Sequence, residues 1–321
     1  MEKIKARAFP GLLSRAAQWA KQQRRLTSLW RRLRWFGPLR NLAARLQQIK
    51  DDETPPRDLK TIAALRLPRN EAFAATARAA NAVEGMFTPM AMSVIDSLLS
   101  FQGEAGITGN FLEFGVFRGR SAVLMGRHLG GQERLVLVDI ADYLDRDALA
   151  PFRDQIDFIL TPTENFRACY PAYGRNAHTF RFIHIDASHA YRATFHELEM
   201  ADQLLTKQGG IIALDDFANL NYSQNISAIF KYLHTTQTDL TMFLVTDEKA
   251  YLCRRRDRGF FAAFVLDRLL AEMEARDIPD RVLSRTETDI DHNTFYVRDR
   301  LPKELGNYYA ISVYEDSYRR P

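Results

Sequence analysis

Three aspartates and one histidine that follow two short apolar runs have the clearest chemical potential in the sequence. Asp186 ends one run and His189 comes three residues later, whereas the pair Asp215 and Asp216 ends another run. If the runs are neighbouring parallel strands, their carboxyl ends meet at one edge of a sheet. Grouped carboxylates raise one another's pKa unless a cation joins them, and Mg²⁺ prefers carboxylate oxygens. These residues predict a site for Mg²⁺ or another divalent cation, with His189 placed to accept a proton from a substrate hydroxyl.

Each of these residues also has a purely structural explanation. Asp186 or Asp216 could cap the helix that follows, and His189 could be a first-turn residue without chemistry. The full set favours the metal and base interpretation, whereas His189 alone does not.

A second group of residues lies in a glycine-containing turn between an apolar run and a helix. The segment 113–121 reads Glu-Phe-Gly-Val-Phe-Arg-Gly-Arg-Ser, and an aspartate ends the next apolar run. Such a turn brings a ligand close to backbone N–H groups, and an acid after the next strand accepts hydrogen bonds from ribose hydroxyls. Phe117 replaces the middle glycine of a dinucleotide motif, which argues against a bound pyrophosphate. The glycines could also serve only close packing. We expect cofactor contacts from Glu113, Gly115, Gly119, Ser121 and Asp139.

Short apolar runs alternate with amphipathic helices between residues 110 and 254. Strands are expected at 111–116, 134–139, 156–160, 181–186, 210–215, 240–246 and 249–254, with helices at 120–129, 146–154, 190–206 and 223–234. This alternation predicts βαβ units, and hence an α/β fold with a doubly wound, seven-stranded, mostly parallel sheet. The last two strands predict an antiparallel hairpin. Further helices are expected at 70–82, 90–101 and 257–276.

The chain divides into four predicted regions. Residues 1–50 form a basic amphipathic helical arm, and 51–105 form a helical lid or linker that begins with acids and two prolines. Residues 106–256 form the catalytic domain, and 257–321 form a C-terminal helix and a polar tail.

The formal net charge of +4 is divided unevenly along the 321 residues. Residues 1–50 hold 13 basic and one acidic side chain, while the remaining 271 residues hold 31 basic and 39 acidic ones. The arm could pack on the body or a partner, lie on an anionic membrane surface, or serve as a transit peptide, for which serine is too sparse. An acidic body without an aromatic RNA platform argues against nucleic-acid binding.

Cysteine content and hydropathy exclude a disulfide scaffold, a cysteine-built zinc site and a membrane-spanning helix. The sequence holds two cysteines, too few for a disulfide scaffold or a cysteine-built zinc site. No apolar run approaches the roughly 18 residues that a membrane-spanning helix needs.

Four segments give the chain a resemblance to a known group of proteins. They are Glu84-Gly85-Met86, the stretch 111–121, the stretch 182–191 and the stretch 209–217. With them, residues 83–254 resemble class I S-adenosylmethionine-dependent methyltransferases, and more narrowly the metal-dependent macrocin-type O-methyltransferases and the related cephalosporin-hydroxylase-like proteins. The resemblance implies a Rossmann-like methyltransferase fold, here with an N-terminal helical extension.

The resemblance also implies roles for particular residues. S-adenosylmethionine is the implied cofactor, with Mg²⁺ held by Asp186, Asp215 and Asp216 and with His189 as the base. The group often has glutamate at the position of Asp215, whose side chain is one methylene shorter.

The implied activity is transfer of a methyl group to a hydroxyl of a small molecule or a sugar-containing acceptor. Two alternatives stay open: a cofactor-binding member of the fold that transfers no methyl group, whether hydroxylase-like or a pseudoenzyme, and a nucleic-acid methyltransferase that uses the basic arm. We expect a cytoplasmic protein, with peripheral membrane contact through residues 1–50 and a homo-oligomer as open possibilities.

Overall fold

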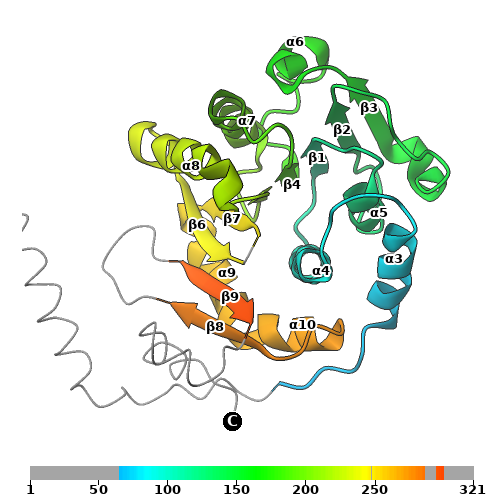
Figure 1. Cartoon of the computed structure of the whole chain (residues 1–321), viewed down its shortest axis with the longest axis vertical. Coiled ribbons are helices and arrows are strands. Elements are labelled where there is room, and N and C mark those ends of the chain that lie inside the picture. Colours follow the sequence, from blue (N-terminus) through cyan, green and yellow to red (C-terminus); the bar gives the residue numbers. More distant parts are fainter. Residues whose placement is uncertain (1–64, 247, 286–293, 300–321) are drawn as a thin grey trace, which may run out of the picture. The chain divides into compact units, whose positions relative to one another are not determined.

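The computed structural model describes residues 65–246, 248–285 and 294–299 (Figure 1). The basic arm at 1–50 and the acidic, proline-containing stretch after it lie outside the described residues. Within the described part of the chain, no helix combines the length and the apolar character needed to cross a membrane.

A mixed sheet of nine strands, counted over the described residues, forms the centre of the fold in the order β3-β2-β1-β4-β5-β7-β6-β9-β8. Strands β1 to β5 pair in parallel, whereas β7 runs antiparallel to both β5 and β6. This confirms the predicted α/β class, the parallel core and the hairpin. The strands are β1 (Asn110–Phe114), β2 (Leu135–Asp139), β3 (Ile156–Leu160), β4 (Phe180–Ile185), β5 (Ile211–Leu214), β6 (Leu240–Val245), β7 (Ala250–Arg254), β8 (Arg281–Arg285) and β9 (Phe295–Asp299).

The sequence predicted seven strands, and β8 and β9 are two further strands that it did not predict. They come from the segment that the sequence suggested was a polar tail, and β9 extends the sheet by pairing in parallel with β6. Each strand is only five residues long and carries arginine, so its apolar positions are few. Leu283, Phe295 and Val297 are nevertheless buried, because they belong to the hydrophobic core that α9 and α10 share on one face of the sheet.

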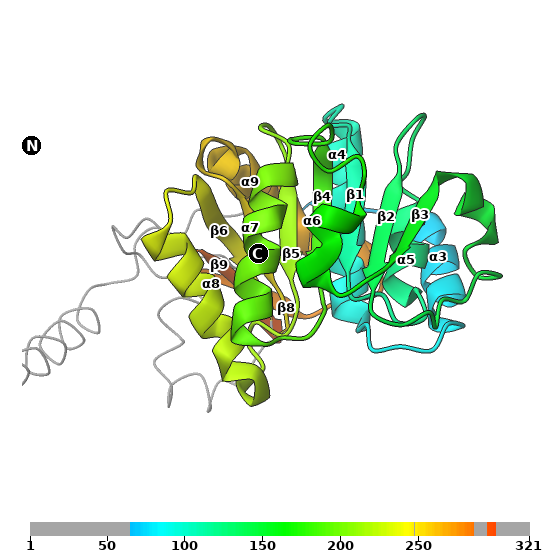
Figure 2. The same cartoon turned by 90° about the horizontal axis from the view of Figure 1, so that it is seen from above.

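Helices cover both faces of the sheet (Figure 2). One face packs against α3 (Glu71–Asn81), α4 (Pro89–Glu104), α5 (Arg120–Gly126), α9 (Arg258–Phe264) and α10 (Leu270–Ala275), and the other against α6 (Phe166–Cys169), α7 (Tyr191–Leu204) and α8 (Ser223–Thr235). The helix predicted at 146–154 is a 3₁₀ segment, Ala150–Gln155. The helix predicted at 257–276 includes a π-helical turn, Val265–Leu269, between α9 and α10.

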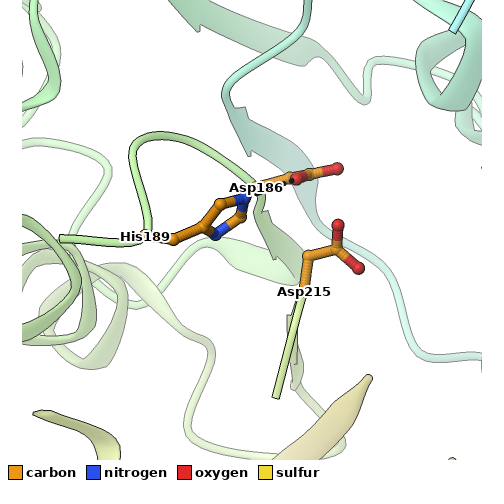
Figure 3. Close-up of side chains that lie close together, drawn as sticks. All are labelled: Asp186, His189 and Asp215. Carbon is orange, nitrogen blue, oxygen red and sulfur yellow. Dashed lines mark ion pairs between the residues drawn. The ribbon is translucent and has the colours of Figure 1, made fainter. Parts of the chain in front are cut away.

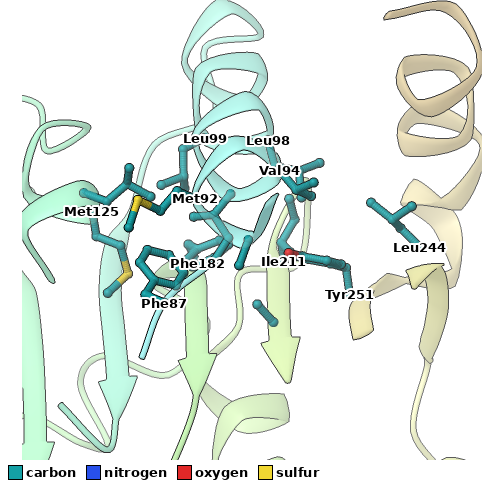
Figure 4. Packing of buried hydrophobic residues seen from close by; sticks show 14 of the residues in the cluster. Phe87, Met92, Val94, Leu98, Leu99, Met125, Phe182, Ile211, Leu244 and Tyr251 are labelled. Atoms are coloured by element: carbon teal, nitrogen blue, oxygen red, sulfur yellow. The ribbon is translucent and has the colours of Figure 1, made fainter. Parts of the chain in front are cut away.

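Alternate strand residues feed two hydrophobic cores, as the two-residue period of a strand requires. Phe111 and Phe182 point toward α4, whereas Leu112 and Ile183 point toward α7. Figure 4 shows the first core, in which α4 lies directly on the sheet. Helix α4 is therefore part of the core of the body, although the sequence placed it in a lid or linker region.

The sheet reverses its winding between β1 and β4. The chain leaves β1 for α5 on one face and leaves β4 for α7 on the other face. The two connecting loops diverge at such a switch point and leave a crevice at the carboxyl ends of the strands. The residues that end β1, β2, β4 and β5 are thereby brought to one place.

Candidate active site

A cavity of about 760 Å³ opens at the carboxyl ends of the parallel strands. Its walls come from the loops after β1, β2, β3, β4 and β5, together with the loop that precedes α4. Seven residues singled out from the sequence line it: Gly115, Ser121, Asp139, Asp186, His189, Asp215 and Asp216. The topology therefore brings both predicted groups of residues to a single cavity.

The turn after β1 is held in shape by Asp139 at the end of β2. One carboxylate oxygen, Oδ2, accepts hydrogen bonds from the backbone N–H groups of Val116 at 2.7 Å and Phe117 at 2.8 Å. Phe117 has a φ of 50°, and its exposed ring lies 5.8 Å from that of Tyr143. An oriented carboxylate flanked by aromatic rings suits the ribose and base of a nucleoside.

The two glycines of the turn allow close packing, which was the alternative explanation from the sequence. Gly115 has a φ of +82°, and a Cβ there would lie 2.0 Å from the carbonyl oxygen of Asp186. Gly119 has a φ of +88°, and a Cβ there would lie 3.1 Å from Leu144 and from Leu149. Gly115 also lines the cavity, whereas Gly119 is not among its described lining residues.

Glu113, expected to contact a cofactor, is instead fully buried beneath the cavity. Its Oε1 accepts a hydrogen bond from Ser121 Oγ and lies 2.7 Å from His184 Nδ1. His184 Nε2 lies 3.0 Å from Lys249 Nζ, and Lys249 forms an ion pair with Asp215. A buried polar chain thus runs under the cavity floor from Ser121 to Asp215.

Sequence reasoning missed two residues of this buried polar chain, His184 and Lys249. The one signal for His184 was a polar residue in the middle of an apolar run. Lys249 stands at the polar turn between the last two predicted strands, where a lysine normally faces solvent. Its side chain is instead 2% exposed.

The predicted base His189 and two of the predicted metal ligands, Asp186 and Asp215, lie close together in the loops after β4 and β5 (Figure 3). His189 Nε2 lies 3.3 Å from Asp216 Oδ2 and 3.7 Å from Asp186 Oδ1. Asp186, His189 and Asp215 each offer a ligand atom within 4.8 Å of the others. Both His189 and Asp216 have a φ of 52°, an uncommon conformation for residues with side chains. The donor set of carboxylates and one imidazole suits a divalent cation.

Burial and charge act in opposite directions on the carboxylates of Asp186 and Asp215, whose side chains are 25% and 16% exposed. Burial raises the pKa of Asp186 well above its usual value; Lys249 offsets this in part, and the Asp215 carboxylate adds to it. Burial also favours the protonated form of Asp215, but the Lys249 ammonium and a hydrogen bond with Asp186 hold its pKa below the usual range. The pKa values of Asp186 and Asp215 therefore shift in opposite directions, since Asp215 forms an ion pair with Lys249 and Asp186 does not.

The loop 84–88 forms the outer wall of the cavity. Arg120 donates a hydrogen bond to the carbonyl oxygen of Gly85 at 2.5 Å, and Thr88 Oγ1 donates to Glu248 at 2.7 Å. Met86 is 98% exposed at the rim. Residues 51–105 were expected to include a lid over the site. Within this region the loop 84–88 reaches the cavity, whereas α4 packs below it.

The central part of the chain is similar to a known protein family. Residues 112–217 match the model of a family described as a methyltransferase domain. The match runs from β1 to the loop after β5, and every residue predicted for the site lies within it. This part of the chain is therefore similar to methyltransferase domains, as the sequence motifs predicted.

Solved structures with low sequence identity share parts of this architecture. The cofactor-bound Rv0187 from MTB is 18% identical over 58% of this chain and 90% of its own, with a TM-score of 0.44. The O-methyltransferase from Bacillus cereus in complex with SAH is 17% identical over 64% and 94%, with a TM-score of 0.41. No curated protein matches the chain.

Proposed function

We propose that this protein transfers a methyl group from S-adenosylmethionine to a hydroxyl of a small-molecule or sugar-containing acceptor with the help of a divalent cation. The observation that carries the proposal is the meeting of Asp186, His189 and Asp216 at the end of a cavity inside a region similar to methyltransferase domains. When bound, S-adenosylmethionine supplies an activated methyl group, and a divalent cation lowers the pKa of a nearby hydroxyl.

The cofactor end of the cavity is formed by the turn after β1 and by Asp139. The Asp139 carboxylate is held by three backbone N–H groups, those of Val116, Phe117 and Ala141, and still lines the cavity, so its remaining lone pairs can accept hydrogen bonds from ribose hydroxyls. Ser121 and Gly115 line the same wall. Ser121 Oγ donates its hydrogen to Glu113, which leaves its oxygen as an acceptor.

The acceptor end is formed by His189 and the carboxylates around it. His189 Nε2 faces Asp186 and Asp216, and its ring lies 4.8 Å from that of Tyr222. A neutral imidazole between two carboxylates can take the hydroxyl proton, because the carboxylates stabilise the imidazolium that forms. The carboxylates at the ends of β4 and β5 would hold the cation.

Methyl transfer itself asks little covalent work of the protein. The residues of this cavity hold donor and acceptor in line, and such alignment is worth about 7–11 kcal/mol in favourable cases. The loop 84–88 would help to exclude water from the aligned pair, since it forms the outer wall.

The proposal is tested by incubating the protein with S-adenosylmethionine labelled at the methyl group and a panel of hydroxylated small molecules and glycosides. We expect label transfer with Mg²⁺ and loss of transfer in EDTA, with cofactor binding unchanged. Asp186→Ala should behave like EDTA treatment. Cofactor binding without transfer to any acceptor would favour a non-methylating member of the fold, and full transfer in EDTA would exclude the metal.

A further inference from the structure

Lys249 is a buried ammonium group next to the carboxylates of the site. Its side chain is 2% exposed, and its Nζ lies 5.6 Å from the centre of the Phe87 ring, which covers it. A lysine this deep in a protein needs an anion in direct contact, because a lone buried charge is very costly. Among the described residues, the ion pairs assign Asp215 to that role.

Backbone pairing sets the contact between Lys249 and Asp215. Leu214 of β5 pairs with Ala250 of β7 in antiparallel register, so the residues just beyond them lie side by side. The turn is fixed as well, since Lys249 N donates to Thr246 Oγ1 at 3.0 Å and Thr246 N donates to Lys249 O at 2.8 Å. The pair is therefore a property of the sheet and does not depend on the choice of one side-chain rotamer.

The other neighbours of Lys249 leave the ammonium little freedom to turn away. A charged lysine can only donate, so His184 Nε2, at 3.0 Å, accepts. His184 then carries its proton on Nδ1 and donates it to Glu113 Oε1 at 2.7 Å. Ser121 also donates to Glu113 Oε1, while Glu113 Oε2 has no hydrogen-bond partner among the described residues. With His184 neutral, Lys249 is the cation of this buried polar chain, and its charge is paired with Asp215.

We propose that Lys249 acts as an internal cation that occupies Asp215, so that Asp186 is the carboxylate left to hold the divalent cation beside His189. This rests on the proposed function, and it departs from the set of three aspartates that the family resemblance implies. Among the described ion pairs no lysine or arginine pairs with Asp186, whose partners there are histidines. Asp216 Oδ2 lies 3.3 Å from His189 Nε2, but the residues whose ligand atoms lie within 4.8 Å of one another are Asp186, His189 and Asp215. Mg²⁺ is commonly held by one or two carboxylates plus waters and substrate oxygens, so one free carboxylate suffices.

The inference predicts how charge changes at this pair alter binding of the metal alone. Titration calorimetry with Mg²⁺, repeated with Mn²⁺, should give at least about tenfold tighter binding for Lys249→Met, because a positive charge beside the site is lost and Asp215 is freed. The double variant Asp215→Asn with Lys249→Met removes both charges and keeps the net charge. Its affinity should stay within about threefold of the natural protein.

Two variants calibrate these measurements. Asp186→Asn should abolish measurable metal binding, since it removes a ligand. Arg181→Met removes another buried cation at the opposite edge of the same sheet and should leave metal affinity unchanged. Circular dichroism and thermal unfolding on every variant separate loss of a ligand from loss of the fold.

The possible outcomes separate the two proposals. If the double variant loses metal binding as completely as Asp186→Asn, or if Lys249→Met binds no more tightly than the natural protein, the inference about Lys249 is overturned while metal-dependent transfer stands. If the natural protein binds no metal and transfers methyl in EDTA, the metal part of the proposed function fails. In that case tight binding by Lys249→Met would still support the role of Lys249, and its absence would overturn it.

Discussion

The two edges of the parallel sheet treat their buried charges in opposite ways. At the amino edge, Arg181 contacts both oxygens of Glu133, at 2.9 and 3.0 Å, and also donates to the carbonyl oxygen of His128. At the carboxyl edge, Asp186 and Asp216 face each other across His189, and the buried cation Lys249 is already engaged by Asp215. One edge is therefore matched in charge, and the other has an excess of negative charge.

Cavity size does not separate these edges. A cavity of about 630 Å³ lies at the amino edge, bordered by Arg181 and Glu133, against about 760 Å³ at the carboxyl edge. Charges that are paired within the fold stabilise it or fix its geometry, whereas unmatched carboxylates cost stability and are kept where a ligand or a reaction uses them. Unmatched charge, more than cavity volume, therefore distinguishes the edge that carries the candidate site.

The largest expected effect concerns the amino edge of the sheet, where Arg181 and Glu133 are paired. Glu133→Gln should lower the free energy of unfolding by about 3–5 kcal/mol, because Arg181 would be left buried without its counter-charge. Urea unfolding measures this. Asp186→Asn is the matched change at the other edge and should leave stability unchanged or increase it, since it removes repulsion between carboxylates. Equal losses for the two variants would contradict the comparison.

The next effect concerns the chemistry at the carboxyl edge of the sheet, where His189 lies between Asp186 and Asp216. His189→Ala should slow methyl transfer about a hundredfold or more, because the acceptor hydroxyl loses its proton acceptor. Initial rates with saturating cofactor and an acceptor found in the labelling assay measure this. His196→Ala, on α7 with a side chain 61% exposed, is the control and should transfer at the natural rate. A His189 variant that retained the natural rate would remove this residue from the mechanism.

A third effect concerns an acid near the cavity, Glu197, which forms no ion pair with another of the described residues. Glu197 accepts a hydrogen bond from Thr163 at 2.6 Å, and burial raises its pKa to about 7. The unfolded chain releases this proton near its ordinary pKa of 4.5, whereas the folded protein keeps it up to about 7. Stability contributed by this group is therefore lost as the pH rises between these values.

Glu197→Gln should remove that loss. At pH 8 the variant should be more stable than the natural protein by about 2 kcal/mol, with little difference near pH 4.5. Urea unfolding at both pH values measures the difference. The control is Glu199→Gln on the same helix, whose side chain is 44% exposed, and it should follow the natural protein. A pH profile of the Glu197 variant parallel to the natural one would refute the assignment.

The smallest effect concerns backbone strain at the unmatched edge. Asp216 has a φ of 52°, a conformation that aspartate and asparagine tolerate better than other residues with a Cβ. Asp216→Ala should therefore lower the free energy of unfolding by about 1 kcal/mol, and Asp216→Asn by less than about 0.5 kcal/mol. If urea unfolding ranks alanine above asparagine, this loop is not strained.

The layout of the fold could be predicted from the sequence because its signals are local. Apolar runs alternate with helical patterns, so the parallel strands and the hairpin are each set by neighbouring residues. The same logic predicted that Asp186 and Asp215 would meet, since parallel strands end at one edge. Strands β8 and β9 were not predicted from the sequence. Each is a short segment that contains arginine, and it becomes extended only because it pairs with its neighbours in the sheet.

The buried chain beneath the cavity could not be predicted in the same way. Glu113 lies on β1, His184 on β4 and Lys249 in the turn before β7, and their contacts depend on the order in which these strands pair. A lysine at a polar turn is expected to face solvent, and only tertiary packing places Phe87 over it.

The close approach of Gly115 to Asp186 has a consequence for how such a protein could be altered. Because a Cβ at Gly115 would lie 2.0 Å from the carbonyl oxygen of Asp186, the cofactor turn and the loop after β4 are fitted to each other at backbone level. Neither loop can be exchanged alone without displacing the other. Diversification of the acceptor, by evolution or by design, is left to the walls that lack this constraint, the loop 84–88 and the segment 219–222.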